Sequence, residues 1–299
     1  MKKTIHSRDP VFKIVIHTIL ILVTVVTVIP MILTISVSFT DSMTITMGGY
    51  KLIPEKFSLL AYEWIFRSPD QLITGYKNSI ILTGVGTLLN LLITSMVAYP
   101  LSRRDFAYRS FISAFLFFTM IFSGGMVPSY ILIVRYLNLK NTLLAIMLPA
   151  LAAPFNIFLL RVLFQDIPVS LLEAAKIDGS SDWGTLFRIV LPLSKPALAT
   201  LALMMALGYW NEAFSAILYI DTADKYPIQL ILNNITKIVD MVKTSGAVSG
   251  NPYMVDPNSI PSDSIMFAMM VIASLPMIFL FTFLQKYFVK GMTTGAVKG

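Results

Sequence analysis

Runs without a charged residue recur along the chain and consist mainly of Leu, Ile, Val, Met and Phe. They cover residues 14–40, 78–102, 110–134, 141–160, 196–211 and 264–285. A helix crosses a bilayer with about 20 predominantly apolar residues. The run that begins at residue 196 is shorter, because Glu212 interrupts it before it continues without charge to Ile220. A membrane barrel would show short alternating strands instead, so the pattern predicts an all-α integral membrane protein with six transmembrane helices.

The composition agrees with extensive contact with lipid. Of the 299 residues, 56% are hydrophobic and 13% are charged, whereas roughly 25% are charged in a soluble domain. The chain contains no Cys and two His. This excludes disulfides, thiolate metal sites and cysteine nucleophiles, and no metal site is expected.

Basic residues predict how the chain is oriented. Six helices place both termini, residues 101–109 and residues 161–195 on one side, which then holds 14 of the 23 Lys and Arg residues. By the positive-inside rule this side is cytoplasmic. The net charge of +7 is therefore explained without nucleic acid, and no compact basic stripe with interleaved aromatic residues is present.

The first apolar run follows basic residues, as in a signal peptide. It is much longer than the roughly 7–15 apolar residues of a signal peptide and lacks a small-residue cleavage pattern. We expect a retained first helix, bent or loosened at Pro30. The predicted division is a cytoplasmic segment at 1–13, a transmembrane domain at 14–290 and a cytoplasmic tail at 291–299.

Two long segments are predicted outside the cell, at 40–77 and 221–263. The second contains Ile228, Ile231, Ile235, Ile238 and Val242 at helical spacing, which predicts one apolar helix face. This face could lie on a pore mouth or contact a delivery protein. Packing against the outer ends of the transmembrane helices is the favoured interpretation.

The cytoplasmic loop at 161–195 has the pattern of a helix, a break and a second helix. Pro168 suits a first helical turn, Gly179 can end a helix in the left-handed conformation, and Ser181 or Asp182 can cap the next one. Pro192 is expected to end the second helix. Such a helix pair, which projects the carboxylate of Glu173, could dock into a cytoplasmic partner or be an ordinary connector.

The spacing of this loop resembles the EAA loop of binding-protein-dependent ABC import permeases. The matching residues are Glu173, Ala174, Ala175, Gly179, Ile189, Leu191 and Pro192. The C-terminal residues 289–299, the outer stretch 48–54 and the run 210–212 resemble the maltose-permease-like branch, which imports oligosaccharides. Within that branch, the chain is most similar to permeases of complex-oligosaccharide systems of Gram-positive bacteria.

The resemblance implies a type I ABC importer permease fold in the bacterial plasma membrane. The EAA helix would be the coupling helix, in which Glu173 contacts a basic residue of the ATPase and Gly179 sets the bend. The tail would reach between the ATPase subunits through Thr293, Thr294, Gly295 and Lys298. The implied partners are a second related permease, an ATPase dimer that binds ATP and Mg, and an extracytoplasmic solute-binding protein.

The absence of certain motifs agrees with a permease that relies on a separate ATPase. No Gly-Lys dipeptide occurs, so the chain has no Walker A loop to hold phosphates. Neither Gly-x-Ser-x-Gly nor His-Glu-x-x-His occurs, so enzyme chemistry is unsupported. We expect a transport subunit that binds no cofactor, with ATP hydrolysis on a separate chain.

Glu212 is the acidic residue that lies within an apolar segment, and such a charge usually faces a cavity. With Tyr209, Trp210 and Asn211 it could form part of a sugar path, or it could pair with a neighbouring helix near the membrane edge. Asn90 is a weaker candidate, for which hydrogen bonding between helices is the favoured role. A polyol or sugar phosphate as cargo, a self-sufficient channel and an intramembrane enzyme are the alternatives. A phosphate would favour basic residues within the spans, and a channel or enzyme would favour an ionisable cluster at mid-depth.

Overall fold

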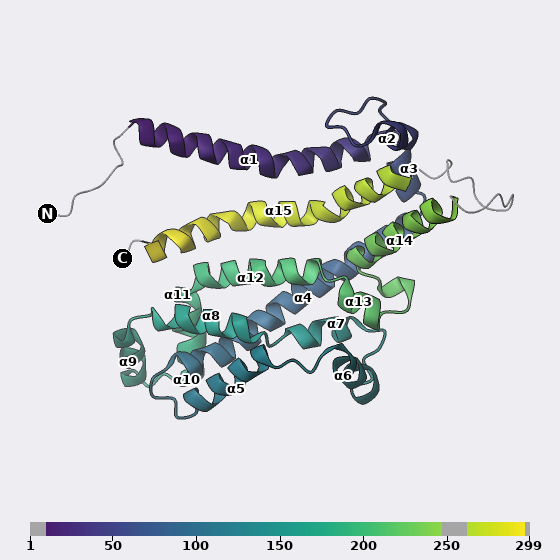
Figure 1. The fold of residues 1–299 in the computed structure, drawn as a ribbon. Coiled ribbons are helices and arrows are strands. Elements are labelled where there is room, and N and C mark those ends of the chain that lie inside the picture. Colours follow the sequence, from purple (N-terminus) through teal and green to yellow (C-terminus); the bar gives the residue numbers. More distant parts are fainter. Residues whose placement is uncertain (1–9, 247–261, 297–299) are drawn as a thin grey trace. The chain divides into compact units, whose positions relative to one another are not determined.

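The computed structural model describes residues 10–246 and 262–296, which form helices joined by turns (Figure 1). Within these residues, the strand-like feature is an isolated bridge between Thr40 and Phe57. The helices are α1 (Pro10–Ser38), α2 (Ser42–Gly48), α3 (Leu60–Ile65), α4 (Pro69–Ser102), α5 (Arg109–Ile121), α6 (Met126–Ile131), η1 (Leu132–Tyr136), α7 (Leu143–Ala150), α8 (Pro154–Gln165), α9 (Val169–Ile177), α10 (Asp182–Thr185), η2 (Leu186–Val190), α11 (Leu191–Leu193), α12 (Lys195–Trp210), α13 (Phe214–Tyr219), η3 (Ala223–Lys225), α14 (Ile228–Gly246) and α15 (Ser262–Ala296).

Six membrane spans fit this set of helices, as the apolar runs predicted. By length and hydropathy, three described helices can each cross a bilayer, namely Val11–Ser38, Pro69–Ser102 and Asp263–Thr282. Three bent pairs supply the rest: Arg109–Ile121 with Met126–Tyr136, Leu143–Ala150 with Pro154–Gln165, and Asp182–Leu193 with Lys195–Trp210. In the last pair, a bend of 84° separates the loop segment Asp182–Leu193 from α12, which is the part assigned to the fifth span. Helix α4 starts nine residues before the expected position, and α15 continues beyond residue 290.

The runs at 110–134 and 141–160 are not single straight helices. The first is broken after Ile121 with a bend of 111°, where Gly125 adopts a positive φ of 84°. The second bends by 50° before Pro154, which occupies the first turn of α8. Hydropathy does not reveal such breaks, because Gly and Pro interrupt the backbone pattern while the segment stays apolar.

The chain divides into two compact units, Met1–Pro69 with Asn234–Ser274 and Asp70–Asn233 with Leu275–Gly299. In the first unit, aromatic contacts hold the turn after α1. The ring of Phe39 stacks on Phe57 at 5.5 Å and on Tyr62 at 4.9 Å between centroids. The hydroxyls of Ser42 and Ser264 lie 2.7 Å apart and join α2 to the start of α15.

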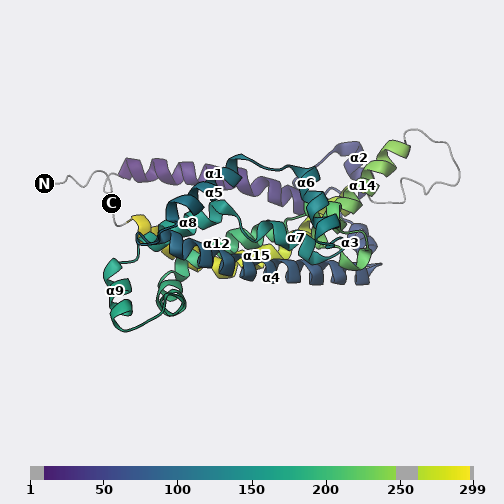
Figure 2. The same cartoon turned by 90° about the horizontal axis from the view of Figure 1, so that it is seen from below.

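The second unit has a hydrophobic core that several helices share. Buried residues from α4, α8, α9, α12 and η2 form one cluster, which includes Leu101, Leu160, Leu172, Leu186 and Leu201. Figures 1 and 2 show α9 at the end of this unit where α4 finishes, and Figure 1 shows α6 and α13 at the other end. The loop predicted to be cytoplasmic is therefore a structured extension of the core.

Helix α14 forms where the isoleucine spacing predicted a helix. Within the second unit, Ile228 and Ile231 are buried and lie against Gly75 of α4. The backbone N–H of Ile228 donates to Ser79 Oγ at 2.8 Å. These contacts fit the packing interpretation for the first turns. Further along, Ile238 is 48% exposed while Val239 is buried, so the buried face does not follow the expected isoleucines.

Candidate functional site

Helix α9 carries the Glu-Ala-Ala sequence and presents two sides. Leu172 and Ala175 are buried, and Leu172 joins the core cluster of α4, α8 and α12. Glu173 and Ala174 are exposed. The side that packs on the molecule is therefore distinct from the side that carries the free carboxylate.

Gly179 ends α9 in the left-handed conformation, as predicted. Its φ is +75°, and a side-chain carbon added there would meet nothing within 4 Å, so backbone conformation alone disfavours another residue. The N–H of Gly179 donates to the carbonyl of Lys176 at 3.1 Å, and that of Ser180 donates to Ala175 at 2.9 Å. This pair of bonds is the Schellman motif, which fixes how the chain leaves the helix.

Ser181 caps the next helix, since its Oγ accepts the backbone N–H of Gly184 at 3.1 Å. The prediction that Pro192 ends this helix is wrong. Pro192 lies inside α11, and the chain bends by 84° at Ser194 before α12. Helix η2 is a π-helix, and the N–H of Leu191 bonds to Leu186 five residues back. Proline is tolerated after it because the missing N–H falls at the start of a new segment.

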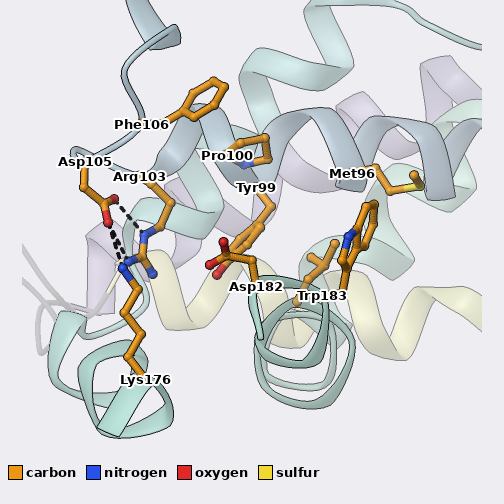
Figure 3. Close-up of a pocket in the computed structure, with 10 residues that line it drawn as sticks. Met96, Tyr99, Pro100, Arg103, Asp105, Phe106, Lys176, Asp182 and Trp183 are labelled. Atoms are coloured by element: carbon orange, nitrogen blue, oxygen red, sulfur yellow. Dashed lines mark hydrogen bonds and ion pairs between the residues drawn. The ribbon is translucent and has the colours of Figure 1, made fainter. Parts of the chain in front are cut away.

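A charged cluster joins α9 to the segment that follows α4. Arg103 donates from Nε to Asp105 Oδ1 and from Nη2 to Oδ2, both at 3.2 Å. Lys176 Nζ lies 2.9 Å from the same Oδ2, and Figure 3 shows the three side chains together. The hydrogen bond from Arg103, reinforced by that from Lys176, holds the pKa of Asp105 well below its usual range. The hydrogen bond to Asp105 in turn raises the pKa of Arg103.

A cavity of about 350 Å³ lies between this cluster and α10. Its lining includes Tyr99, Arg103, Lys176, Asp182 and Trp183, which Figure 3 shows around the opening. The Tyr99 hydroxyl and Arg103 Nη1 are buried there and have no hydrogen-bond partner among the described residues. A neighbouring cavity is lined by Arg104, Arg109 and Glu173 among others. The described residues hold no group of three His, Cys, Asp or Glu side chains placed to bind a metal ion.

Apolar side chains on the loop remain exposed. Ile177 is 86% exposed and Trp183 is 57% exposed. The rings of Trp183 and Phe187 stack with centroids 6.2 Å apart. Exposed aromatic and aliphatic groups beside a free carboxylate are typical of a surface that binds another protein.

The candidate sugar-path residues at 209–212 lie at the end of α12 and differ in how far each is buried. Tyr209 and Trp210 are buried, and the Trp210 ring lies 6.3 Å from that of Tyr76. Asn211 is exposed and Glu212 half-buried. Glu212 Oε1 accepts the N–H of Ser215 at 2.8 Å and so caps α13. The expected continuation of the fifth span is therefore broken at residues 211–213.

Asn90 is buried in α4 and bonds between helices. Its Nδ2 donates to the carbonyl of Ala150 at 2.6 Å, and its Oδ1 accepts from Thr94 at 3.0 Å. In the tail, Thr293, Thr294 and Gly295 fall in the last turns of α15, and Lys298 lies outside the described residues.

Sequence reasoning missed the roles of Arg103, Asp105 and Lys176. The two basic residues among them indicated the orientation of the chain and nothing more. Asp105 and Lys176 are 71 positions apart, and no local pattern pairs them.

Comparisons with known proteins agree with this architecture. Residues 90–294 match the family described as binding-protein-dependent transport system inner membrane component. The chain is 39% identical to Protein LplC of Bacillus subtilis, over 92% of this chain and 90% of that protein. It is 38% identical to the polygalacturonan/rhamnogalacturonan transport system permease protein YtcP of the same organism, over 98% and 100%. A crystal structure of a bacterial ABC transporter involved in the import of the acidic polysaccharide alginate contains a similar chain. That chain is 31% identical with a TM-score of 0.77, and the match covers 95% of this chain and 99% of that one.

Proposed function

The chain belongs to the family of binding-protein-dependent transport system inner membrane components, and we propose that it forms half of the translocation pathway of an ABC importer. A second, related permease would form the other half. A solute-binding protein would deliver the cargo from outside, and an ATPase dimer would drive transport from the cytoplasm.

The observation that carries this proposal is the helical loop between α8 and α12. It combines an exposed Glu173, a Schellman turn at Gly179 and a capped second helix on a buried core. A rigid surface element of this kind can dock into a groove of an ATPase and pass on its movement. Ala174 has no bulk that would keep a partner surface away from the helix backbone, while Ile189, Leu191 and Pro192 continue the motif toward α12.

The ATPase is proposed as a separate chain because the sequence offers no phosphate-binding Gly-Lys loop. The orientation is proposed from the basic residues, with both termini cytoplasmic. The end of α15, with Thr293, Thr294 and Gly295, and the following Lys298 would then lie on the ATPase side and contact it.

An oligosaccharide is the proposed cargo. This rests on the names of the similar proteins, which concern polygalacturonan or rhamnogalacturonan in one case and alginate in another. Asn211 and Glu212 at the end of α12 are candidates for the sugar path, with Tyr209 and Trp210 behind them and Asn90 deeper in α4. Competition for uptake among acidic oligosaccharides, neutral oligosaccharides, polyols and sugar phosphates would identify the class.

Substitution of Glu173 and Gly179 tests the coupling role. In the complex reconstituted with its ATPase and binding protein, Glu173→Ala and Gly179→Leu should reduce uptake strongly while the chain still inserts into the membrane. The first change removes the carboxylate that is proposed to contact the ATPase. The second places a branched side chain at a positive φ, which distorts the turn.

Glu63→Ala is the matched control, since Glu63 is an exposed carboxylate on α3 in the segment predicted to lie outside the cell. It should leave uptake unchanged. Normal transport by both the Glu173→Ala and the Gly179→Leu variants would refute the coupling role of this loop.

A further inference from the structure

Helix α9 contacts the rest of the second unit in two physically different ways. Leu172 packs in the apolar core, and Ala175 is buried. On the adjoining side, Lys176 forms an ion pair with Asp105, which is itself held by Arg103 at the end of α4. The two contacts therefore hold α9 on the core and tie it to the segment that directly follows α4.

The two kinds of contact respond differently to movement. Burial of apolar side chains has no preferred direction, whereas an ion pair joins two particular atoms. A forked arginine–carboxylate pair fixes both distance and angle. Arg103 forms such a pair with Asp105 within the segment that follows α4, and so it orients the carboxylate that Lys176 of α9 contacts. Its side chain is 17% exposed, so it has little freedom to reorient.

We propose that Arg103, Asp105 and Lys176 form the mechanical link through which displacement of α9 is passed to α4. Asp105 is the central positioning residue, since it accepts bonds from Arg103, which directly follows the last residue of α4, and from Lys176 of α9. The link rests on the proposed function, because it requires that an ATPase moves α9.

The charge states suit such a permanent connection. The pKa of Asp105 lies well below its usual range because Arg103 and Lys176 hydrogen-bond to the carboxylate. The carboxylate therefore stays ionised throughout the physiological pH range. The negative charge of Asp105, and with it the ion pair, is lost only in acid, as the pH falls through this lowered pKa.

The link contributes little to folding, which makes it testable. Lys176 and Asp105 are 51% and 57% exposed, and ion pairs at such exposed positions stabilise a fold only weakly. Removing the pair should therefore leave insertion and subunit assembly intact. The loss should appear in the transmission of movement, measured as sugar transported per ATP hydrolysed.

The test uses the full reconstituted complex with the variants Asp105→Asn and Lys176→Gln. Each should lower the transport-to-hydrolysis ratio roughly five-fold or more, the lower end of typical coupling between sites. Lys176→Arg, which keeps the positive charge that contacts Asp105, should keep most of that ratio. A residue with a merely structural role would change the amount of assembled complex instead of the ratio.

The chain offers a matched control in the ion pair between Lys140 and Asp221. Its Nζ–Oδ2 distance is also 2.9 Å, and its side chains are 41% and 57% exposed. Lys140→Gln should leave the ratio unchanged.

Wild-type ratios in Asp105→Asn and Lys176→Gln, while Glu173→Ala abolishes uptake, would overturn the link and leave the coupling role of α9 standing. If Glu173→Ala also transports normally, the proposed function itself fails. If the single variants reduce the amount of assembled complex and leave the ratio of that complex unchanged, the residues have a structural role and the link is contradicted.

Discussion

At the scale of single residues, two glycines of α4 show how closely the helices of the second unit approach. A side-chain carbon at Gly86 would lie 2.9 Å from the ring of Tyr209 on α12, whereas one at Gly84 meets nothing within 4 Å. The Tyr209 ring is buried and its hydroxyl donates to the carbonyl of Met147 at 3.3 Å. Displacement of the ring would therefore break the hydrogen bond between the Tyr209 hydroxyl and Met147.

Gly86→Ala is expected to lower the thermal stability of the purified protein in detergent, by about 1–3 kcal/mol, because the added methyl overpacks this contact. Gly84→Ala in the same helix should be neutral or stabilise by up to about 1 kcal/mol, since alanine favours helix. Melting curves of the two variants test this. Equal melting temperatures would show that α4 and α12 do not pack closely at Gly86.

At the scale of elements, the break between α12 and α13 gives Glu212 a structural role alongside its candidate place on the sugar path. Its carboxylate caps α13 through the N–H of Ser215. A glutamine can still accept this bond through its amide oxygen but has no charge. The two roles can therefore be separated by substitution.

Glu212→Ala should cost about 1 kcal/mol of stability, because it leaves a helix N–H without its acceptor. Glu212→Gln should keep the wild-type melting temperature. If Glu212 serves only as a cap, Glu212→Gln also keeps the wild-type KM for uptake. A raised KM with an unchanged melting temperature would place the carboxylate on the sugar path.

At the scale of the whole molecule, the orientation rests on the distribution of basic residues and can be tested directly. The chain has no cysteine, so a single introduced thiol reports one position. Met47 and Tyr108 are 84% and 67% exposed, and they belong to segments predicted to lie on opposite sides of the membrane.

A membrane-impermeant maleimide added to intact cells should label the Met47→Cys variant and leave the Tyr108→Cys variant unlabelled. Opening the membrane should expose the second thiol to the reagent. Labelling of Tyr108→Cys in intact cells would reverse the proposed orientation, and with it the assignment of the α9 loop to the cytoplasm.

The sequence by itself determined the six spans, the helical loop and its Gly179 turn. Each depends on properties that are local to the chain. Apolar length decides whether a helix can cross a bilayer, and a glycine that follows a helix can adopt the left-handed turn.

Only the tertiary structure decided what these elements touch. In the structure the apolar run at 110–134 is interrupted after Ile121, and the loop bends at Ser194 and not at Pro192. Glu212 accepts a backbone N–H at the start of α13. The tertiary structure also joined Asp105 to Lys176, 71 positions further along the chain. A pair so distant in sequence forms through the packing of α4 against α9, which no local periodicity encodes. The proposed contact surface can therefore be predicted from the residues of the loop, while the proposed link to α4 requires the folded molecule.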